Sequence, residues 1–429
     1  MAGTDVISHL PTDIVDEVIS YLRDDANTLR ACTLLNADWT VAARRLLFAS
    51  ASVHLDNPKK YGQHALLDRA AKHLRAFAAF LDRTPYACGF VKKLQLVSPL
   101  VDISGLSLDD DDPPEDSDPD NGHTVDFHVD LRDLFLVLQK LPALHNLVVT
   151  ATLWSPLAED GALDPETVSG LRCPWIKSLT ISTSTKYRPY PIKSTQVAAI
   201  LHLLPGLSEL SICCGAIRLL GVTARAQTIM PQEMALRTLF LDSNEMLIIP
   251  SLVHTASVNT LESLEFGGKL FTWDDIRPMG VFFDSAGPRL KHLRFLNMGW
   301  QPNVSVEPVK LWQGLHIHKC TALRSLQLEA NLSAWGDQSW KIVRMILKAC
   351  TDSSGLEQFT LDLVGLHDLR MADRPLLRYL DALQTCLLAF PALKSVRLVN
   401  RTPAMPTEFL RSSLSALQAK GLLRFNDEC

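Results

Sequence analysis

The chain of 429 residues lacks several features that mark common classes of protein. It has no run of about 18 apolar residues, which a membrane-spanning helix needs, so we expect no membrane association. Its N-terminus has no basic stretch followed by an apolar core, which argues against a secretory signal. The nine cysteines are odd in number and form no C-x-x-C pair. This usage is typical of reduced thiols, so we expect the protein in the cytoplasm, the nucleus or both.

Motifs for catalysis or cofactor binding are also missing. The chain contains neither phosphate-binding glycine motif, G-x-G-x-x-G or G-x-x-x-x-G-K-[ST], and neither H-E-x-x-H nor G-x-S-x-G. The formal net charge of −5 supplies no global attraction to nucleic acids or anionic membranes. We therefore expect a protein that is not an enzyme, holds no cofactor and binds neither nucleic acid nor membrane.

One cluster has the composition of a metal site. His316, His318 and Cys320 alternate in LHIHKC, and ligands at every second residue of a strand meet on one face. However, Cys320 stands three residues before a predicted strand, as Cys173 does, which favours a place in the apolar core. We expect no metal, and a metal-dependent hydrolase built on this cluster ranks last among the functions considered.

What the chain has instead is an internal repeat. A hexamer of the form L-x-x-L-x-L, with other aliphatic residues or Phe as substitutes, recurs ten times after residue 90. Its central residues follow one another at steps of 25 to 37 residues, after a first step of 53. The ten units are VKKLQL (91–96), LHNLVV (144–149), IKSLTI (176–181), LSELSI (207–212), LRTLFL (236–241), LESLEF (261–266), LKHLRF (290–295), LRSLQL (323–328), LEQFTL (356–361) and LKSVRL (393–398).

Alternation within each unit predicts a strand with one buried face. Helical patterns precede several units, at 131–141, 195–204, 340–350 and 376–390. The whole resembles an irregular leucine-rich-repeat solenoid over residues 85–425, in which each helix–strand unit buries its apolar face against its neighbours. Residues 106–122 form an acidic, proline-rich insertion, predicted to be a disordered loop. A final helix near 407–420 is predicted to cap the repeats.

The N-terminal stretch from Leu10 to Phe48 predicts three short amphipathic helices. Thr12 is a candidate N-cap for the first helix, and Asp25 or Asn27 for the second. In the third, Trp39, Ala42, Ala43, Leu46 and Leu47 share one face. Three helices this short bury little by themselves, so their apolar faces need the rest of the chain or a partner.

These residues resemble an F-box, through Leu10-Pro11, the aliphatic positions Ile14, Val18 and Leu22, the Trp39 position and the closing RRLLF. One position departs from that family, which usually has a small polar residue or Cys and then a basic residue where Asn36-Ala37-Asp38 stands. The resemblance implies an α/β protein with an F-box-like module at 8–50, a linker helix at 51–84 and a solenoid of about ten units at 85–425.

The function implied is that of the substrate-recognition subunit of an SCF-type E3 ubiquitin ligase. The module would bind the Skp adaptor of a cullin–RING ligase, and the solenoid would bind an unknown protein target. The adaptor-binding residues implied are Leu10, Pro11, Ile14, Val18, Leu22, Leu29, Leu35 and Trp39. The alternative is a stand-alone repeat scaffold for protein interactions, unconnected to ubiquitination, with the N-terminal helices serving as its cap.

Residues between the buried leucines of a strand face outward, and aromatic residues gather in the segments after the strands. On the outward face, five carboxylates (Glu209, Asp242, Glu265, Glu329 and Asp362) outnumber Arg294 and Arg397, which favours a partner of basic or hydrogen-bonding character. The predicted target-binding residues are Tyr187, Tyr190, Glu209, Phe240, Asp242, Glu265, Trp273, Arg294, Trp300, Glu329 and Trp335.

Overall fold

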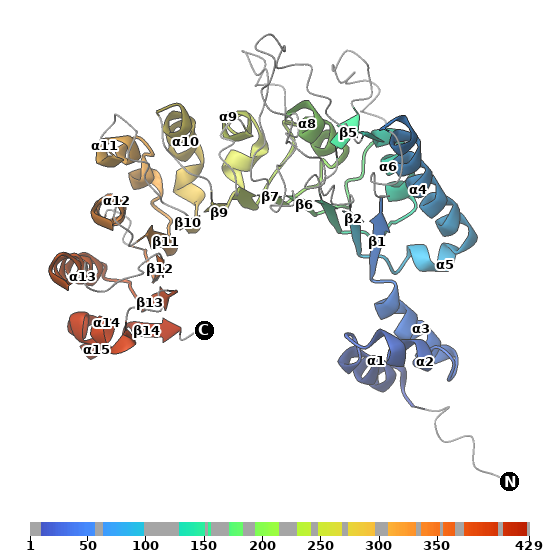
Figure 1. Ribbon diagram of the computed structural model, residues 1–429, viewed down its shortest axis with the longest axis horizontal. Helices are drawn as coiled ribbons and strands as arrows, with labels where there is room; N and C mark the ends of the chain where they lie inside the picture. The colour runs from blue at the N-terminus through green and yellow to red at the C-terminus, as the bar shows by residue number, and fades with distance from the viewer. Residues whose placement is uncertain are drawn as a thin grey trace, which may run out of the picture. The chain divides into compact units, whose positions relative to one another are not determined.

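The protein is an α/β structure in which helices alternate with parallel strands (Figure 1). The computed structural model describes residues 10–55, 63–97, 128–150, 153–155, 171–182, 194–213, 230–241, 248–267, 273–296, 308–331, 336–351, 355–364, 373–401 and 406–426. The chain divides into two compact units. Unit 1 spans Met1–Tyr190 and Thr195–Gly206, and unit 2 spans Pro191–Ser194 and Leu207–Cys429. Among the helices in the described ranges, none has the length and apolar character needed to cross a membrane.

Unit 1 begins with the three predicted helices, α1 (Thr12–Tyr21), α2 (Ala26–Cys32) and α3 (Ala37–Leu47). The prediction of Thr12 as an N-cap is wrong. The N-cap position of α1 is Pro11, whose carbonyl accepts a hydrogen bond from the Val15 N–H at 3.1 Å, so Thr12 is already helical. Asp25 does cap α2, since its Oδ1 accepts hydrogen bonds from the N–H groups of Asn27 and Thr28 at 3.1 and 3.0 Å.

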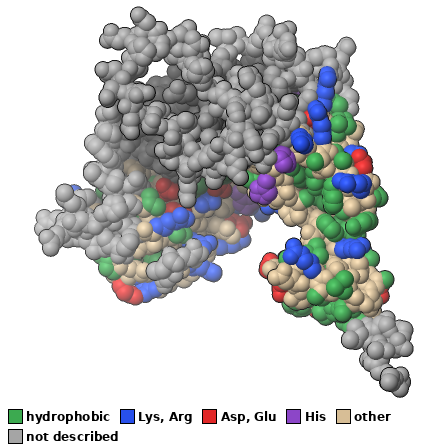
Figure 2. Space-filling view, turned by 45° about the vertical axis from the view of Figure 1, so that its right-hand side comes forward, with side chains coloured by type: hydrophobic (Ala, Val, Ile, Leu, Met, Phe, Trp, Pro, Cys, Tyr) green, Lys and Arg blue, Asp and Glu red, His purple; other side chains and the backbone are tan. Residues whose placement is uncertain are grey.

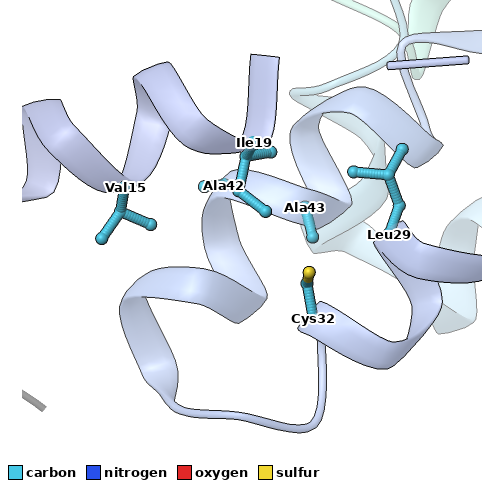
Figure 3. Packing of buried hydrophobic residues seen from close by; sticks show 6 residues of the cluster. All are labelled: Val15, Ile19, Leu29, Cys32, Ala42 and Ala43. Carbon is cyan, nitrogen blue, oxygen red and sulfur yellow. The ribbon is translucent and has the colours of Figure 1, made fainter. Parts of the chain in front are cut away.

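The three helices share a small core of their own. Six buried side chains converge in it from all three helices (Figure 3): Val15, Ile19, Leu29, Cys32, Ala42 and Ala43. Leu22, Trp39, Leu46 and Leu47 pack partly buried against this cluster, as the predicted face of the third helix requires. Two of the six are alanines, so the core is thin and leaves other apolar side chains outside it.

The rest of unit 1 is a parallel sheet with helices. Its strands pair in the order β1-β2-β4-β6, with bounds Ser50–His54, Lys93–Val97, Asn146–Thr150 and Ser178–Ser182. A separate parallel pair is formed by β3 (His128–Asp130) and β5 (Leu153–Ser155). The helices are α4 (Gln63–Arg83), α5 (Pro85–Cys88), α6 (Leu131–Gln139) and α8 (Ser194–Leu203), the last belonging to unit 1 from Thr195 onward.

Unit 2 continues the same alternation. Its strands pair in sequence order, all parallel: β7 (Glu209–Cys213), β8 (Thr238–Leu241), β9 (Ser263–Phe266), β10 (His292–Phe295), β11 (Ser325–Asn331), β12 (Gln358–Val364), β13 (Ser395–Asn400) and β14 (Leu423–Asn426). Between them lie α9 (Ile248–Leu252), η6 (Ala256–Asn259), α10 (Trp273–Ala286), η7 (Gly287–Arg289), α11 (Pro308–Gln313), η8 (Ile317–Lys319), α12 (Gly336–Ala349), α13 (Asp373–Leu388), α14 (Thr407–Ser413) and α15 (Ser415–Ala419). Figure 1 shows these helices along one side of the strands.

All ten predicted strands are present, and the repeat sets their register. Within each unit, the central residue of a hexamer pairs with the central residue of the next, for example Leu264 with Leu293 and Leu293 with Leu326. These central side chains are buried, with Leu94 and Leu147 both at 0% exposure. The repeat therefore stacks one apolar layer per unit, as its periodicity predicts.

The prediction is incomplete at its ends. β1 lies partly in the segment predicted as the linker, and within that segment α4 begins at Gln63, where a helical pattern of apolar residues begins in the sequence. The helix predicted near 407–420 is two helices, α14 and α15, which meet at Leu414 and are followed by the edge strand β14. β1 and β14 are the terminal strands and each pairs with one neighbouring strand. Neither carries the full hexamer, so the repeat pattern did not predict them. The predicted insertion at 106–122 lies outside the described residues.

Candidate docking surface on the N-terminal helices

Helix α1 carries apolar side chains on two sides. Val15 and Ile19 face the module's core and are each 1% exposed, whereas Ile14 is 40% and Val18 is 39% exposed. Tyr21, seven residues after Ile14 and thus on the same side of the helix, is 81% exposed. Leu10, four residues before Ile14, is exposed as well. We call Leu10, Ile14, Val18 and Tyr21 the α1 face.

A second apolar group lies at the junction of α2 and α3. Leu34 and Leu35 follow the end of α2 and are 85% and 57% exposed, and Val41 on α3 is also exposed. Figure 2 shows hydrophobic side chains spread over the N-terminal helices, with charged side chains toward the margins. Seven of the twelve exposed large hydrophobic side chains in the described ranges thus belong to residues 10–41.

Solvent-exposed apolar side chains scattered singly are ordinary, whereas a concentration of them on one small module is unusual. Full burial of an aliphatic side chain contributes about 1.5–3 kcal/mol. The α1 face and the Leu34–Val41 group are therefore apolar side chains that the fold of the described residues leaves exposed.

The predicted adaptor-binding residues are distributed over three environments. Leu10, Pro11, Ile14, Val18 and Leu35 are exposed. Leu22 and Trp39 are half-buried against the module's core, and Leu29 is inside it at 2% exposure. Leu29 consequently supports the module from within and offers a partner almost no surface.

Sequence reasoning missed Tyr21, Leu34 and Val41. Tyr21 was detectable, since it continues the i, i+4, i+7 spacing of Ile14 and Val18. Leu34 was not, because Leu34 and Leu35 stand together where α2 ends, and helical periodicity no longer decides which side chain is buried.

Asn36 explains the departure in the segment before Trp39. Its Oδ1 accepts a hydrogen bond from the backbone N–H of Trp39 at 3.1 Å, so it is the N-cap of α3. Asp38 follows in the first turn, where the helix dipole favours a negative charge. This segment is therefore a conventional helix start.

The module also contacts the helix that precedes β2. The ring of Phe48 meets the ring of Tyr86 edge-on, with centroids 6.3 Å apart, and the guanidinium of Arg44 lies 5.1 Å from the same ring centroid. Tyr86 belongs to α5, so the end of α3 is tied to the repeat units of unit 1.

On the strands of unit 2, the predicted outward-facing residues form a polar row. Arg294 donates through Nη1 to Glu265 Oε1 at 2.8 Å across neighbouring strands. Asp362 is 1% exposed and accepts from Gln327 Nε2 at 3.2 Å, with Arg401 Nη2 at 3.5 Å. Two of the five carboxylates counted from the sequence are thus matched by arginines within the protein, which weakens the predicted preference for a basic partner.

Of the remaining predicted target-binding residues, three have described side chains and six do not. Glu209 is exposed, and Phe240 and Glu329 are half-buried, all three on strands. Trp273 begins α10, but its side chain lies outside the described part of the chain, as do Tyr187, Tyr190, Asp242, Trp300 and Trp335.

The His316–Cys320 cluster does not have the strand geometry that the alternative of a metal site requires. Residues 317–319 form the 3-10 helix η8, so the three side chains do not alternate along a strand. His316 Nδ1 lies 3.0 Å from both carboxylate oxygens of Asp284. Cys320 is 1% exposed, as expected of a core position, and burial raises the pKa of its thiol. Within the described ranges, no group of three His, Cys, Asp or Glu residues is placed to hold a metal.

The chain matches no known family model and no curated protein.

Proposed function

We propose that this protein is the substrate-recognition subunit of an SCF-type ubiquitin ligase. Its N-terminal module would be an F-box that binds the Skp adaptor, and its repeat units would be leucine-rich repeats that bind a protein target. The observation that carries the proposal is the exposed apolar surface of the module, namely the α1 face with Leu34, Leu35 and Val41. The proposal places the protein in the cytoplasm, the nucleus or both.

On this proposal the chain performs no chemistry itself. It would hold the target near a cullin–RING ligase, so that transfer of ubiquitin becomes an effectively intramolecular event. The polar row on the strands of unit 2, with Glu209 exposed and Glu265 half-buried, supplies hydrogen-bonding groups for a target.

Substitution of the α1 face tests adaptor binding directly. We expect the purified protein to bind a Skp adaptor, and Ile14→Glu with Val18→Glu to weaken that binding by about 100-fold or more, because two charges would enter an apolar contact. Isothermal titration calorimetry with the purified adaptor measures the change.

The matched control introduces the same charges on exposed aliphatic residues elsewhere. Leu136 on α6 and Val281 on α10 are each 49% exposed, so Leu136→Glu with Val281→Glu should leave adaptor affinity unchanged. Failure of the wild-type protein to bind the adaptor, or equal binding by the Ile14→Glu, Val18→Glu variant, refutes the proposal.

A second candidate is a stand-alone interaction scaffold whose N-terminal helices only cap the repeat units. The contact of Phe48 and Arg44 with Tyr86 favours it, because a cap must pack on what it covers. This function requires no adaptor and leaves the exposed α1 face unexplained, so we rank it second.

A further inference from the structure

The helical side of unit 2 holds a basic surface that the proposed function does not use. Lys341, Arg344 and Lys348 are exposed on α12, at positions that share one side of the helix. Arg378 is exposed on the neighbouring helix α13. We call these four residues the α12 basic stripe.

The stripe borders two grooves. One has a volume of about 670 Å³ and is lined by Lys341, Arg344 and Lys348 together with Trp312, Ile317 and His318 among others. The other, of about 170 Å³, lies between α12 and α13 and is lined by Lys341, Arg344 and Arg378 together with Trp340, Tyr379 and Leu383 among others. Among the lining residues that the structure describes, neither groove has a carboxylate.

Five other basic residues of unit 2 differ, because a carboxylate pairs with each of them. These ion pairs are Lys291–Glu262, Arg294–Glu265, Lys394–Glu357, Arg401–Asp362 and Arg411–Glu408. In the described part of the chain, Lys341, Arg344, Lys348 and Arg378 take part in no ion pair. The stripe is thus a local excess of positive charge on a chain whose net charge is −5.

The groove walls are partly apolar and include two tryptophans packed against other rings. Trp312 is 5% exposed and meets the Phe295 ring edge-on, with centroids 5.5 Å apart. Trp340 is 4% exposed and stacks on Tyr379 with centroids 5.8 Å apart. Fixed aromatic walls beside cations suit a ligand that combines negative charge with apolar side chains.

We propose that the α12 basic stripe and its two grooves bind an acidic segment of a partner protein, with an apolar side chain of that segment entering the larger groove. Lys341 and Lys348 are seven residues apart, which corresponds to about 10 Å along the helix. An extended peptide covers that distance with about three residues. A short run of acidic residues therefore matches the stripe.

The dimensions favour a peptide over larger polyanions. Nucleic acids and anionic membranes are attracted by extended positive fields, which a chain of net charge −5 does not supply. Four cations around one helix act over a short range, at which a peptide carboxylate can reach each of them.

The test uses the full-length protein and a displayed library of random peptides of about 12 residues. Peptides enriched on the wild-type protein are synthesised, labelled and titrated by fluorescence anisotropy. We expect enriched peptides to carry several Asp or Glu residues with at least one apolar residue. Their Kd should rise about tenfold or more in the variant Lys341→Glu, Arg344→Glu.

The matched control, Lys420→Glu with Arg424→Glu, makes the same charge change at two exposed residues outside the grooves and should leave the Kd unaltered. Circular dichroism checks that each variant is folded, and Lys341→Gln with Arg344→Gln repeats the test without added negative charge. The proposal is overturned if enriched peptides are neutral or basic, or if they bind the Lys341→Glu, Arg344→Glu variant as tightly as the wild type.

Two further probes address other polyanions. Single-stranded RNA of about 20 nucleotides and phosphatidylserine vesicles are titrated in the same buffer. Either probe binding more tightly than the enriched peptides, and losing affinity in the Lys341→Glu, Arg344→Glu variant, assigns the stripe to that class and overturns the peptide proposal. Adaptor binding through the α1 face is measured separately, so neither result decides the other.

Discussion

At the scale of single residues, Asn36 links the sequence of the N-terminal module to its stability. A free N–H at the start of α3 is satisfied by the Asn36 side chain, and Trp39, whose N–H it caps, packs on the module's core. Because the core holds only six buried side chains, the free energy lost with one N-cap is a large fraction of the module's total stability.

We expect Asn36→Ala to destabilise the start of α3 by about 1 kcal/mol, the usual cost of losing an N-cap. Hydrogen exchange of peptides covering residues 37–47 should accelerate, and exchange in unit 2 should not change. Asn36→Asp preserves the acceptor and is the control. Unchanged exchange in Asn36→Ala would contradict the role assigned to this cap.

At the scale of elements, the backbones of neighbouring repeats come so close at a few positions that only glycine, which has no Cβ, fits there. Gly280 lies in α10, and a Cβ built on it would stand 2.2 Å from the carbonyl oxygen of Gly314, in the segment that follows α11. Since the obstacle is backbone, the side chain of a larger residue cannot turn away from it. The spacing of α10 from the next repeat therefore depends on this residue.

Gly280→Ala should destabilise unit 2 by about 2 kcal/mol or more, because the α10 helix must shift to relieve the overlap. Urea denaturation followed by circular dichroism measures the loss. Gly355→Ala is the control, since its Cβ would meet only the Leu323 carbonyl oxygen at 3.6 Å, an ordinary contact. A Gly280→Ala protein as stable as the control would show that the repeats adjust freely.

At the scale of the whole molecule, the question is whether the N-terminal helices serve a partner or the repeat units. The boundary for separating them is Ala49, because its carbonyl accepts hydrogen bonds from the N–H groups of Lys92 and Lys93 and β1 follows at once. A chain that begins at Ala49 keeps β1 and its pairing with β2.

If the module is an F-box, this truncated chain should remain folded and monodisperse while losing all adaptor binding. Its melting temperature should fall only slightly, because the lost contacts at Tyr86 are worth about 1–2 kcal/mol. Tyr86→Ala in the full-length chain removes the same contacts and calibrates that loss. Aggregation or unfolding of the truncated chain alone would favour the scaffold with a helical cap.

The sequence by itself determined the repeat architecture and the core of each repeat. Ten hexamers predicted ten strands, and all are present with their central residues aligned, because alternation of apolar side chains is a local property that neighbouring units reinforce. The strands β1 and β14 escaped prediction, since an edge strand obtains its pairing from one neighbour and needs no full hexamer of its own.

Only the tertiary structure decided which apolar residues of the N-terminal helices are buried in the module's core and which stay exposed. Leu29 and Leu35 both belong to the predicted adaptor-binding set, yet Leu29 is 2% and Leu35 is 57% exposed. Ion pairing was likewise decided by the tertiary structure. The sequence shows how many carboxylates and basic residues there are, but the fold pairs Glu265 with Arg294. In the described residues it leaves Lys341 and Arg344 without ion pairs. Burial and pairing depend on which elements pack together in space, and for that reason the sequence predicted the three helices while only the structure showed which of their apolar side chains remain exposed.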